Sequence, residues 1–157
     1  MAGTRRGLIG LGHDLQLISE LEVASALRAP DVFFTSGELR RFAAAAVPAQ
    51  TLAGGFAAKE ALFKALPAGE AWFWTDAELI HDARGAPQFR AHGALASYLA
   101  RRRLRVNVSI SHSGGFASSV VILTGEASAS TCLFTTMYRA VQHVFRRITA
   151  HAAGAPQ

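Results

Sequence analysis

A helical pattern from Gln50 to Leu66 is the feature of this sequence that most constrains its fold. Its large apolar residues recur at helical spacing, and Pro67 stops the pattern because proline cannot continue a helix. Apart from Lys59, Glu60 and Lys64, the stretch is almost wholly apolar or small. The three charges therefore form a compact polar patch, and a carboxylate beside two ammonium groups suits a hard cation and phosphate oxygens.

Other predicted elements lie on both sides of this helix. Thr35 and Glu38 have the spacing of a capping box, which predicts that a helix starts there. The alternation of Val106, Val108 and Ile110 with polar residues predicts a half-buried strand. The remaining predicted elements are a short strand from Leu8 that ends at Asp14, a helix over Leu15–Leu27, strands over Trp72–Trp74 and Ala77–Ile80, a turn over Ala83–Pro87, a helix over Leu95–Arg103 and a hairpin strand over Ala117–Leu123. Strands interleaved with helices of unequal length favour a compact α+β domain.

The last thirty residues change in character. A small polar linker starts at Gly125, and the apolar residues from Leu133 to Ile148 have the spacing of one amphipathic helix. We expect residues 1–124 to form the main domain and residues 125–157 to add the linker and this C-terminal helix. The helix could pack on its own domain, on another copy of the chain or on a partner.

Composition limits the classes of function. The 157 residues carry 16 Lys and Arg against 11 Asp and Glu, a net charge of +5, which admits nucleic acid, phosphorylated cofactors or an acidic protein as partners. Cys132 is the only cysteine, so no intrachain disulfide can form, and we expect a cytoplasmic protein. His13 and Asp14 interrupt the apolar run near the N-terminus, which argues against a signal peptide. No stretch is long and apolar enough to predict a membrane-spanning helix.

Three separate positions could carry chemistry. Asp14 stands at the end of the predicted first strand, where a carboxylate either caps the next helix or meets a cation. Glu60 lies four residues before Lys64, so the two could form an ordinary ion pair within the helix. His112 precedes Ser113 and two glycines, and it is either structural or part of an anion-binding turn. The sequence has no zinc-ligand spacing, nucleophile elbow, phosphate-binding loop or dinucleotide fingerprint.

Taken together, these positions resemble the holo-acyl-carrier-protein synthase type of 4′-phosphopantetheinyl transferase. The segment Gly10–Leu15 is similar to the N-terminal Gly-x-Gly-x-Asp motif of that family, and Leu52–Leu66 is similar to its signature helix. Ser109–His112 resembles its strand-end motif, and Asp82–Pro87 resembles the turn between the two. The resemblance extends from about Leu8 to Leu123, and its middle motif is the most specific.

The resemblance implies an enzyme that transfers 4′-phosphopantetheine from coenzyme A to a serine of an apo acyl carrier protein and releases adenosine 3′,5′-bisphosphate. It implies that Asp14 and Glu60 hold Mg²⁺, and that Lys64 stabilises charge on the phosphate oxygens. All three are thus expected to be catalytic, and either Glu60 or a metal-bound water would take the serine proton. Coenzyme A would be contacted by four side chains, those of Lys59, Lys64, Ser111 and His112.

The family resemblance also implies a homotrimer with active sites between subunits, in which Asp14 works with a neighbour's helix. The chain departs from the family at two places near the signature helix. Gly55 stands where the family usually has arginine. Residues 46–50 lack the basic pair often found there for the 3′-phosphate of the coenzyme, so Arg40, Arg41 or another base would have to substitute.

A third departure concerns the first helix. Glu20 and Glu22 stand where the family often presents arginines to the acidic carrier protein, and the first basic residue there is Arg28, so the preferred carrier could be unusual. These departures leave one alternative, a non-catalytic relative that binds coenzyme A or a carrier protein. A nucleic-acid-binding module built on the arginines of 101–105 and 146–147 is disfavoured, because aromatic residues do not interleave with them. We expect neither nucleic acid nor a membrane as a partner.

Overall fold

The structure, a computed structural model, describes residues 6–22, 24–67 and 71–126. Residues 7–125 form one compact unit. The predicted linker and amphipathic helix over 125–157 lie outside the described residues, except that Gly125 and Glu126 end the last strand. None of the helices in the described ranges is long and apolar enough to cross a membrane.

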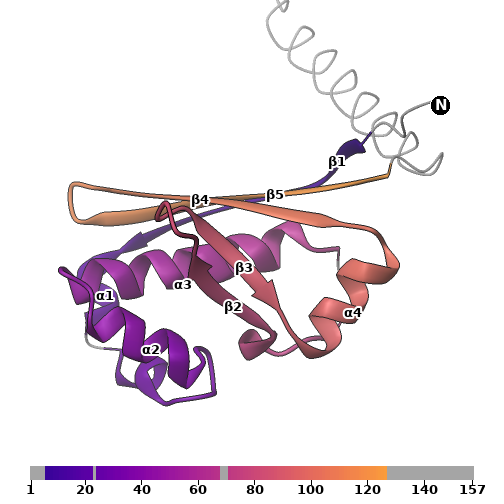
Figure 1. Cartoon of the computed structure of the whole chain (residues 1–157). Coiled ribbons are helices and arrows are strands. Elements are labelled where there is room, and N and C mark those ends of the chain that lie inside the picture. The colour runs from indigo at the N-terminus through magenta and orange to yellow at the C-terminus, as the bar shows by residue number, and fades with distance from the viewer. Residues whose placement is uncertain (1–5, 23, 68–70, 127–157) are drawn as a thin grey trace, which may run out of the picture. The chain divides into compact units, whose positions relative to one another are not determined.

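Two antiparallel groups of strands form the framework (Figure 1). In the larger sheet the strand order is β1-β5-β4, and β2 pairs with β3 in a separate hairpin. The strands are β1 (Arg6–Leu17), β2 (Ala77–His81), β3 (Pro87–Ala91), β4 (Arg105–Ser113) and β5 (Phe116–Glu126). The mixture of this sheet with helices of different lengths confirms the predicted α+β class.

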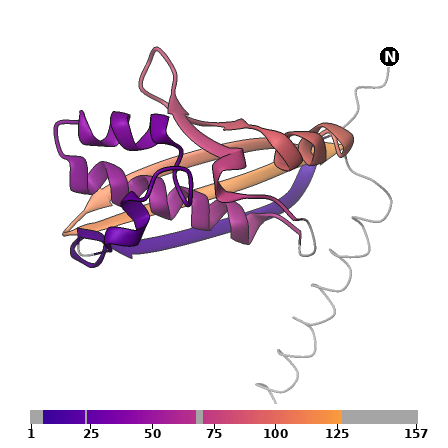
Figure 2. The same cartoon turned by 90° about the horizontal axis from the view of Figure 1, so that it is seen from below.

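One long helix organises the rest of the domain. Figures 1 and 2 show α3 running along one face of the three-stranded sheet, with α2 on the side of α3 that is turned away from the sheet. The short α1 packs against both α3 and β5, because its Leu21 shares a cluster with Ala53 and Ala117. The helices are α1 (Ile18–Glu22), α2 (Ser36–Ala43), α3 (Pro48–Ala65) and α4 (Gly93–Arg101), with short 3₁₀ turns η1 (Ser25–Arg28) and η2 (Trp74–Asp76). The predicted α3 is confirmed and begins two residues earlier than expected, because proline is tolerated in the first helical turn, where its missing N–H is not needed.

The core lies around α3. Its C-terminal half packs against β5 and α4, through Leu62, Val121 and Leu95. Its N-terminal half packs against α2 and β2, through a second cluster that includes Phe34 and Leu79. Ten of the eighteen α3 residues are buried, which explains why the apolar and small residues of this helix are not confined to one stripe.

The β4–β5 register decides which β4 side chains face α3. Ile110 pairs with Ser119 and His112 pairs with Ala117, and both partners on β5 are buried. Ser111 pairs with Ser118 and therefore points to the opposite face, because successive strand residues alternate between faces. The structure thus confirms the predicted alternation and places the neighbouring candidate residues Ser111 and His112 on opposite faces of the sheet.

Two predicted elements are wrong in extent. The first strand continues to Leu17, and the predicted helix over 15–27 shrinks to α1 and the η1 turn. The strand extends because β1 pairs with β5, a partner far away in the sequence that a local pattern does not show. Similarly, the predicted strand over 72–74 is not formed, and Trp74 begins the η2 turn.

Candidate active site

The N-terminal glycines bring β1 into contact with α3. A Cβ atom on Gly12 would lie 2.8 Å from the backbone nitrogen of Ala65 and would overlap the carbonyl oxygen of Ala61. A Cβ on Gly10 would likewise overlap the Ala65 carbonyl. Glycine at both positions therefore lets the strand backbone touch the helix. Because side chains alternate along a strand, Asp14 faces α3 as the two glycines do.

Asp14 meets Lys64 where the β1 backbone crosses α3. The Lys64 ammonium donates to Asp14 Oδ1 at 2.7 Å and to the carbonyl oxygen of His13 at 3.3 Å. The Asp14 side chain is only 13% exposed, whereas that of Lys64 is 47% exposed. Asp14 lies inside β1, four residues before α1 begins, so it does not cap that helix. Of the two alternatives for Asp14, the structure therefore supports the one in which it meets a cation. Within one chain, that cation is Lys64 of α3.

Glu60 adds a second carboxylate beside Asp14. Burial raises the pKa of Glu60, and the negative charge of Asp14 raises it further, while Lys64 acts in the opposite direction. In the described part of the chain, the ion pair of Lys64 is with Asp14 rather than with Glu60. The ordinary intrahelical pair is therefore not what this structure forms, and the two carboxylates share one cation.

The donor set at this crossing fits Mg²⁺. Asp14 Oδ2 is buried and has no hydrogen-bond partner among the described residues, a costly situation that a cation would relieve. The described residues contain no group of three or more His, Cys, Asp and Glu side chains arranged for a metal. Two carboxylates with free coordination positions suit Mg²⁺, which keeps several waters and takes substrate phosphate oxygens. Asp14 and Glu60 are the residues that would hold it.

Lys59 does not belong to this group, and the prediction that it contacts coenzyme A is wrong for this structure. Its side chain is fully buried, and its ammonium donates to Glu38 Oε2 at 3.0 Å and to the carbonyl oxygens of Phe33 and Trp74 at 2.8 and 2.9 Å. An ammonium has three donors, and all three are used. Neighbouring helix residues point about 100° apart, so Lys59 enters the core when Glu60 faces β1.

The partner of Lys59 is itself held firmly. Glu38 is fully buried, and its carboxylate also accepts from the backbone N–H groups of Leu79 and Thr35, each at 2.8 Å. Thr35 Oγ1 accepts in turn from the N–H of Glu38 at 3.1 Å, which confirms the predicted capping box. The box therefore does more than start α2, since its carboxylate also ties α2 to α3 and β2.

His112 lies elsewhere on α3. Its Nε2–H donates to the carbonyl oxygen of Gln50 at 2.9 Å, and a Cβ on Gly54 would lie 2.9 Å from the same nitrogen. Gly54 and Lys64 are ten residues apart, about 15 Å along the helix axis at about 1.5 Å per residue. Within one chain, His112 is therefore not beside the Asp14–Lys64 pair.

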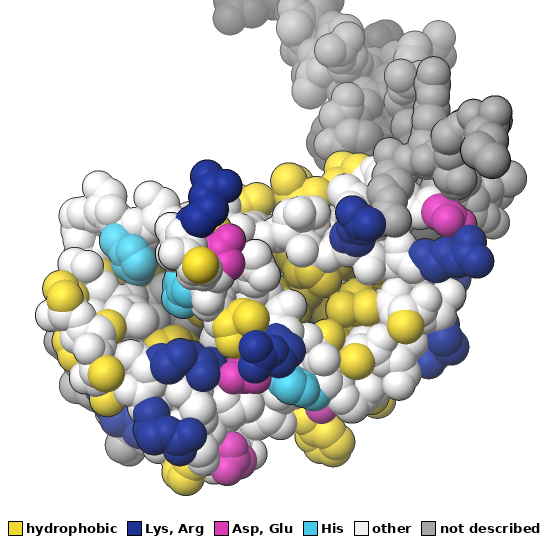
Figure 3. Space-filling view, viewed as in Figure 1, with side chains coloured by type: hydrophobic (Ala, Val, Ile, Leu, Met, Phe, Trp, Pro, Cys, Tyr) yellow, Lys and Arg dark blue, Asp and Glu magenta, His cyan; other side chains and the backbone are white. Residues whose placement is uncertain are grey.

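His112 lines a cleft between α3 and the β2–β3 hairpin with a volume of about 210 Å³. The face that carries this hairpin shows basic, acidic and histidine side chains interspersed (Figure 3). His81 at the end of β2 lines the same cleft. His81 was not among the predicted site residues, and its position directly before the Asp82–Pro87 turn is the signal that could have found it.

The Ser111 side chain points neither toward the Asp14–Lys64 pair nor into the cleft that His112 lines. It is exposed on the sheet face turned away from α3, opposite Ser118. Ser118 shares a hydrogen bond of 3.0 Å with His13 Nε2 on that outer face. A role for Ser111 in coenzyme binding would therefore need a ligand or a second chain on the outer face of the sheet.

The structure shows what surrounds Gly55 and the two arginines that could replace the missing basic pair. A Cβ on Gly55 would lie 2.7 Å from the ring of Phe42, so this buried ring fills the space that a larger residue would enter. One Arg41 nitrogen donates to Glu78 Oε1 at 2.9 Å and to the Leu79 carbonyl at 3.0 Å. Arg41 is thus engaged at the surface of β2, whereas Arg40 is exposed.

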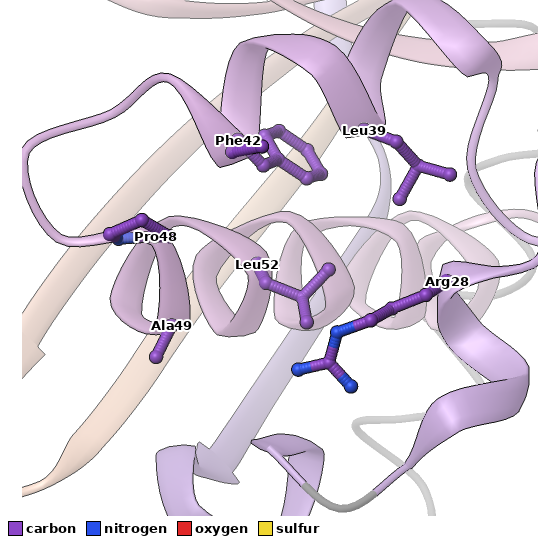
Figure 4. A pocket seen from close by; sticks show the side chains of 7 residues that line it. Arg28, Leu39, Phe42, Pro48, Ala49 and Leu52 are labelled. Atoms are coloured by element: carbon purple, nitrogen blue, oxygen red, sulfur yellow. The ribbon is translucent and has the colours of Figure 1, made fainter.

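A second and larger pocket lies on the other side of Phe42. Its volume is about 500 Å³, and its lining is mostly apolar, from α2 and the first turns of α3. Figure 4 shows Leu39, Phe42 and Leu52 around it, with the Arg28 guanidinium at its edge. No local sequence pattern predicts this pocket, because its walls come from three separate segments.

Comparisons with known proteins place the chain in a family. The 4′-phosphopantetheinyl transferase superfamily matches residues 10–121. The holo-[acyl-carrier-protein] synthase of Streptomyces griseus is 42% identical over 111 residues, which cover 70% of this chain and 81% of that protein.

Solved structures agree with this assignment. The acyl carrier protein synthase of Mycobacterium tuberculosis has a TM-score of 0.61 at 35% identity and covers 76% of this chain and 99% of its own. A coenzyme A complex of the Chronobacterium ammoniagenes enzyme has a TM-score of 0.62 at 27% identity and covers 75% and 98%. The chain therefore belongs to the 4′-phosphopantetheinyl transferase superfamily, as a holo-[acyl-carrier-protein] synthase.

Proposed function

We propose that this chain transfers 4′-phosphopantetheine from coenzyme A to a serine of an apo acyl carrier protein in an Mg²⁺-dependent reaction. The serine oxygen attacks the phosphorus next to the pantetheine arm, the bond to the bridging pyrophosphate oxygen breaks, and adenosine 3′,5′-bisphosphate leaves. The observation that carries the proposal is the meeting of Asp14, Glu60 and Lys64, with one buried Asp14 oxygen unpartnered among the described residues.

The residues of this chain have distinct tasks in that reaction. Asp14 and Glu60 would hold the cation, which when bound would supply positive charge to the phosphate oxygens. Lys64 is half exposed, so its ammonium reaches both Asp14 and a phosphate placed outside it, where it stabilises the charge of the transition state. The raised pKa of Glu60 keeps it a candidate for the serine proton, beside a metal-bound water.

The proposed assembly is a homotrimer. The outer face of the three-stranded sheet carries exposed apolar side chains, with Leu11, Leu15 and Ile122 58%, 57% and 38% exposed. Leu11 and Leu15 alternate with residues that face α3, so they point away from the domain's own core. An apolar sheet face of this kind favours contact with another copy. We further propose that the enzyme works in the cytoplasm, since its single cysteine, Cys132, cannot form an intrachain disulfide.

A carrier assay tests the proposed reaction. Purified protein is incubated with coenzyme A, Mg²⁺ and a panel of apo carrier proteins, and the carrier mass and released adenosine 3′,5′-bisphosphate are followed. We expect a phosphopantetheine adduct on at least one carrier and its loss with Asp14→Ala. Absence of the adduct on every carrier contradicts the proposal and favours the non-catalytic alternative, whereas steady turnover rejects that alternative.

A further inference from the structure

The larger pocket beside Phe42 is a hollow that the side chains of the fold leave open. The chain turns back from α2 to α3 through small residues, since Ala43 ends α2 and Pro48 begins α3, with Ala49 next to it. These small side chains line part of the pocket and do not fill it. Its volume of about 500 Å³ falls in the range of about 300–1,000 Å³ that is typical of small-molecule sites.

The body of this pocket is apolar. Leu39 and Phe42 of α2 and Leu52 of α3 lie around one common space (Figure 4). Phe42 and Leu52 are only 4% and 6% exposed, so these two walls belong to the core and are held in place by it. Such walls favour an apolar ligand, because each apolar group that enters leaves water and gains close contacts.

One charge stands at the edge of the pocket. Of the seven residues that line it, only Arg28 carries a charge, and Figure 4 shows its guanidinium at the rim. A guanidinium has five N–H donors in a planar fork, which matches a carboxylate with two parallel hydrogen bonds. It can therefore hold a ligand carboxylate while it keeps contacts within the fold, and the pocket favours an anion over a cation.

The carboxylates on the neighbouring segments face other groups. The two oxygens of Asp31 accept from the N–H and the hydroxyl of Ser36, each at 2.9 Å. Glu38 is fully buried and is paired with Lys59. Neither carboxylate lines the pocket, so Arg28 is the charge that a ligand in the pocket meets.

The pocket is separate from the catalytic group. Leu52 precedes Lys64 by twelve residues, which is about 18 Å along the axis of α3 at about 1.5 Å per residue. The buried Phe42 ring also stands between the pocket and Gly55, where a Cβ atom would lie 2.7 Å from that ring. A ligand in this pocket therefore does not take the place of the reacting pyrophosphate.

We propose that the pocket walled by Leu39, Phe42 and Leu52, with Arg28 at its rim, is a second ligand site, for a small amphiphile with a carboxylate on an unbranched apolar chain. This is the chemistry of a medium-chain fatty acid, whose chain enters between α2 and α3 and whose carboxylate meets Arg28. An acidic protein segment with an apolar anchor has the same two features. A single side chain would leave much of the volume of about 500 Å³ unfilled, which favours the small molecule. The site is independent of the proposed transfer reaction.

Calorimetric titration of the protein with octanoate tests this site, with hexanoate and octanol as matched ligands. We expect saturable binding of octanoate at one site, about tenfold tighter than binding of hexanoate, because two more methylene groups leave water. Octanol keeps the chain and lacks the charge, so it should bind more weakly than octanoate. Octanoate binding should persist in the presence of saturating coenzyme A, since the pocket is separate from Lys64.

Four variants assign the binding to this pocket. Arg28→Gln should weaken octanoate binding about tenfold, the scale of one hydrogen bond to a charged group, and should leave octanol unchanged. The control Arg40→Gln removes an exposed arginine of α2 that does not line the pocket, and it should leave both ligands unchanged. Ala43→Leu places a larger side chain in the pocket and should weaken both ligands, whereas Ala44→Leu, at an exposed neighbour outside the lining, should not. Thermal melts check that each variant is folded.

Three results would overturn the inference. The first is the absence of saturable octanoate binding, and the second is octanoate binding that coenzyme A displaces. The third is equal weakening by Arg28→Gln and Arg40→Gln, which would indicate only a general attraction of the acid to a basic surface. If octanoate did not bind and Ala43→Leu weakened binding of an apo carrier protein, the pocket would belong to a protein partner instead.

Discussion

Replacing Lys59 by methionine separates a structural lysine from a cofactor-binding one. Methionine keeps most of the length and apolar stem of lysine and removes the ammonium. In Lys59→Met the Glu38 carboxylate stays buried without its cation, and the carbonyl oxygens of Phe33 and Trp74 lose their donor. Breaking one side of a buried ion pair costs about 3–5 kcal/mol, so we expect the free energy of unfolding to fall by about 4 kcal/mol.

Urea unfolding followed by tryptophan fluorescence and circular dichroism measures this loss. With an m value of about 2 kcal/mol/M, the midpoint should drop by about 2 M. Adding Glu38→Gln should restore part of the stability, since it neutralises the buried charge that Lys59→Met leaves behind.

The matched control is Lys64→Met. Lys64 is half exposed, and its pair with Asp14 should contribute less than about 1 kcal/mol, so this variant should remain stable and lose transfer. If Lys59→Met instead kept its stability and lost only coenzyme binding, the structural role assigned to Lys59 would be refuted.

Three further predictions concern the contact of β1 with α3, the pKa of Glu60 and the position of the active site relative to the subunits. Gly12→Ala places a Cβ against the α3 backbone and should cost about 1–3 kcal/mol in urea unfolding, with weaker Mg²⁺ binding; an unchanged midpoint would contradict the close approach. The raised pKa of Glu60 means that the metal-free folded state holds an extra proton between the ordinary and raised values, so this group's stabilisation is lost as pH rises through that window. Thermal melts of wild type and Glu60→Gln without Mg²⁺ from about pH 4 to 8 should show this loss of stability in wild type only. Parallel curves of melting temperature against pH would contradict the raised pKa. If active sites lie between subunits, co-expressed Asp14→Asn and His112→Ala chains should regain transfer in mixed trimers, and inactive mixtures would argue for sites within one chain.

Local signals predicted the part of the fold that depends on neighbours in the sequence. The α3 helix follows from its periodicity and the proline that ends it, and the capping box follows from two residues three positions apart. The alternation along β4 is also enough to put Ser111 and His112 on opposite faces of the sheet, because side chains alternate along a strand. The two residues were nevertheless expected to contact the same coenzyme.

Long-range contacts decide what the sequence pattern left open. The length of β1 depends on β5, which lies about a hundred residues later. The direction of Lys59 could not be predicted, because α3 is surrounded by protein on most sides and its pattern does not mark one solvent face. Residue types grouped Lys59, Glu60 and Lys64, and only the family resemblance joined Asp14 to Glu60 and Lys64. Their geometry follows from the glycines that bring β1 against α3.

The most direct test of the central claim is the rate of a single turnover. Apo carrier and saturating coenzyme A are mixed with excess enzyme and Mg²⁺, and the rate of adduct formation is compared between wild type, Glu60→Gln and Lys64→Met. The Asp14–Glu60–Lys64 assignment predicts a loss of about a hundredfold or more in each variant, with thermal melts that show an intact fold. Rates within a few fold of the wild type in both folded variants would contradict it.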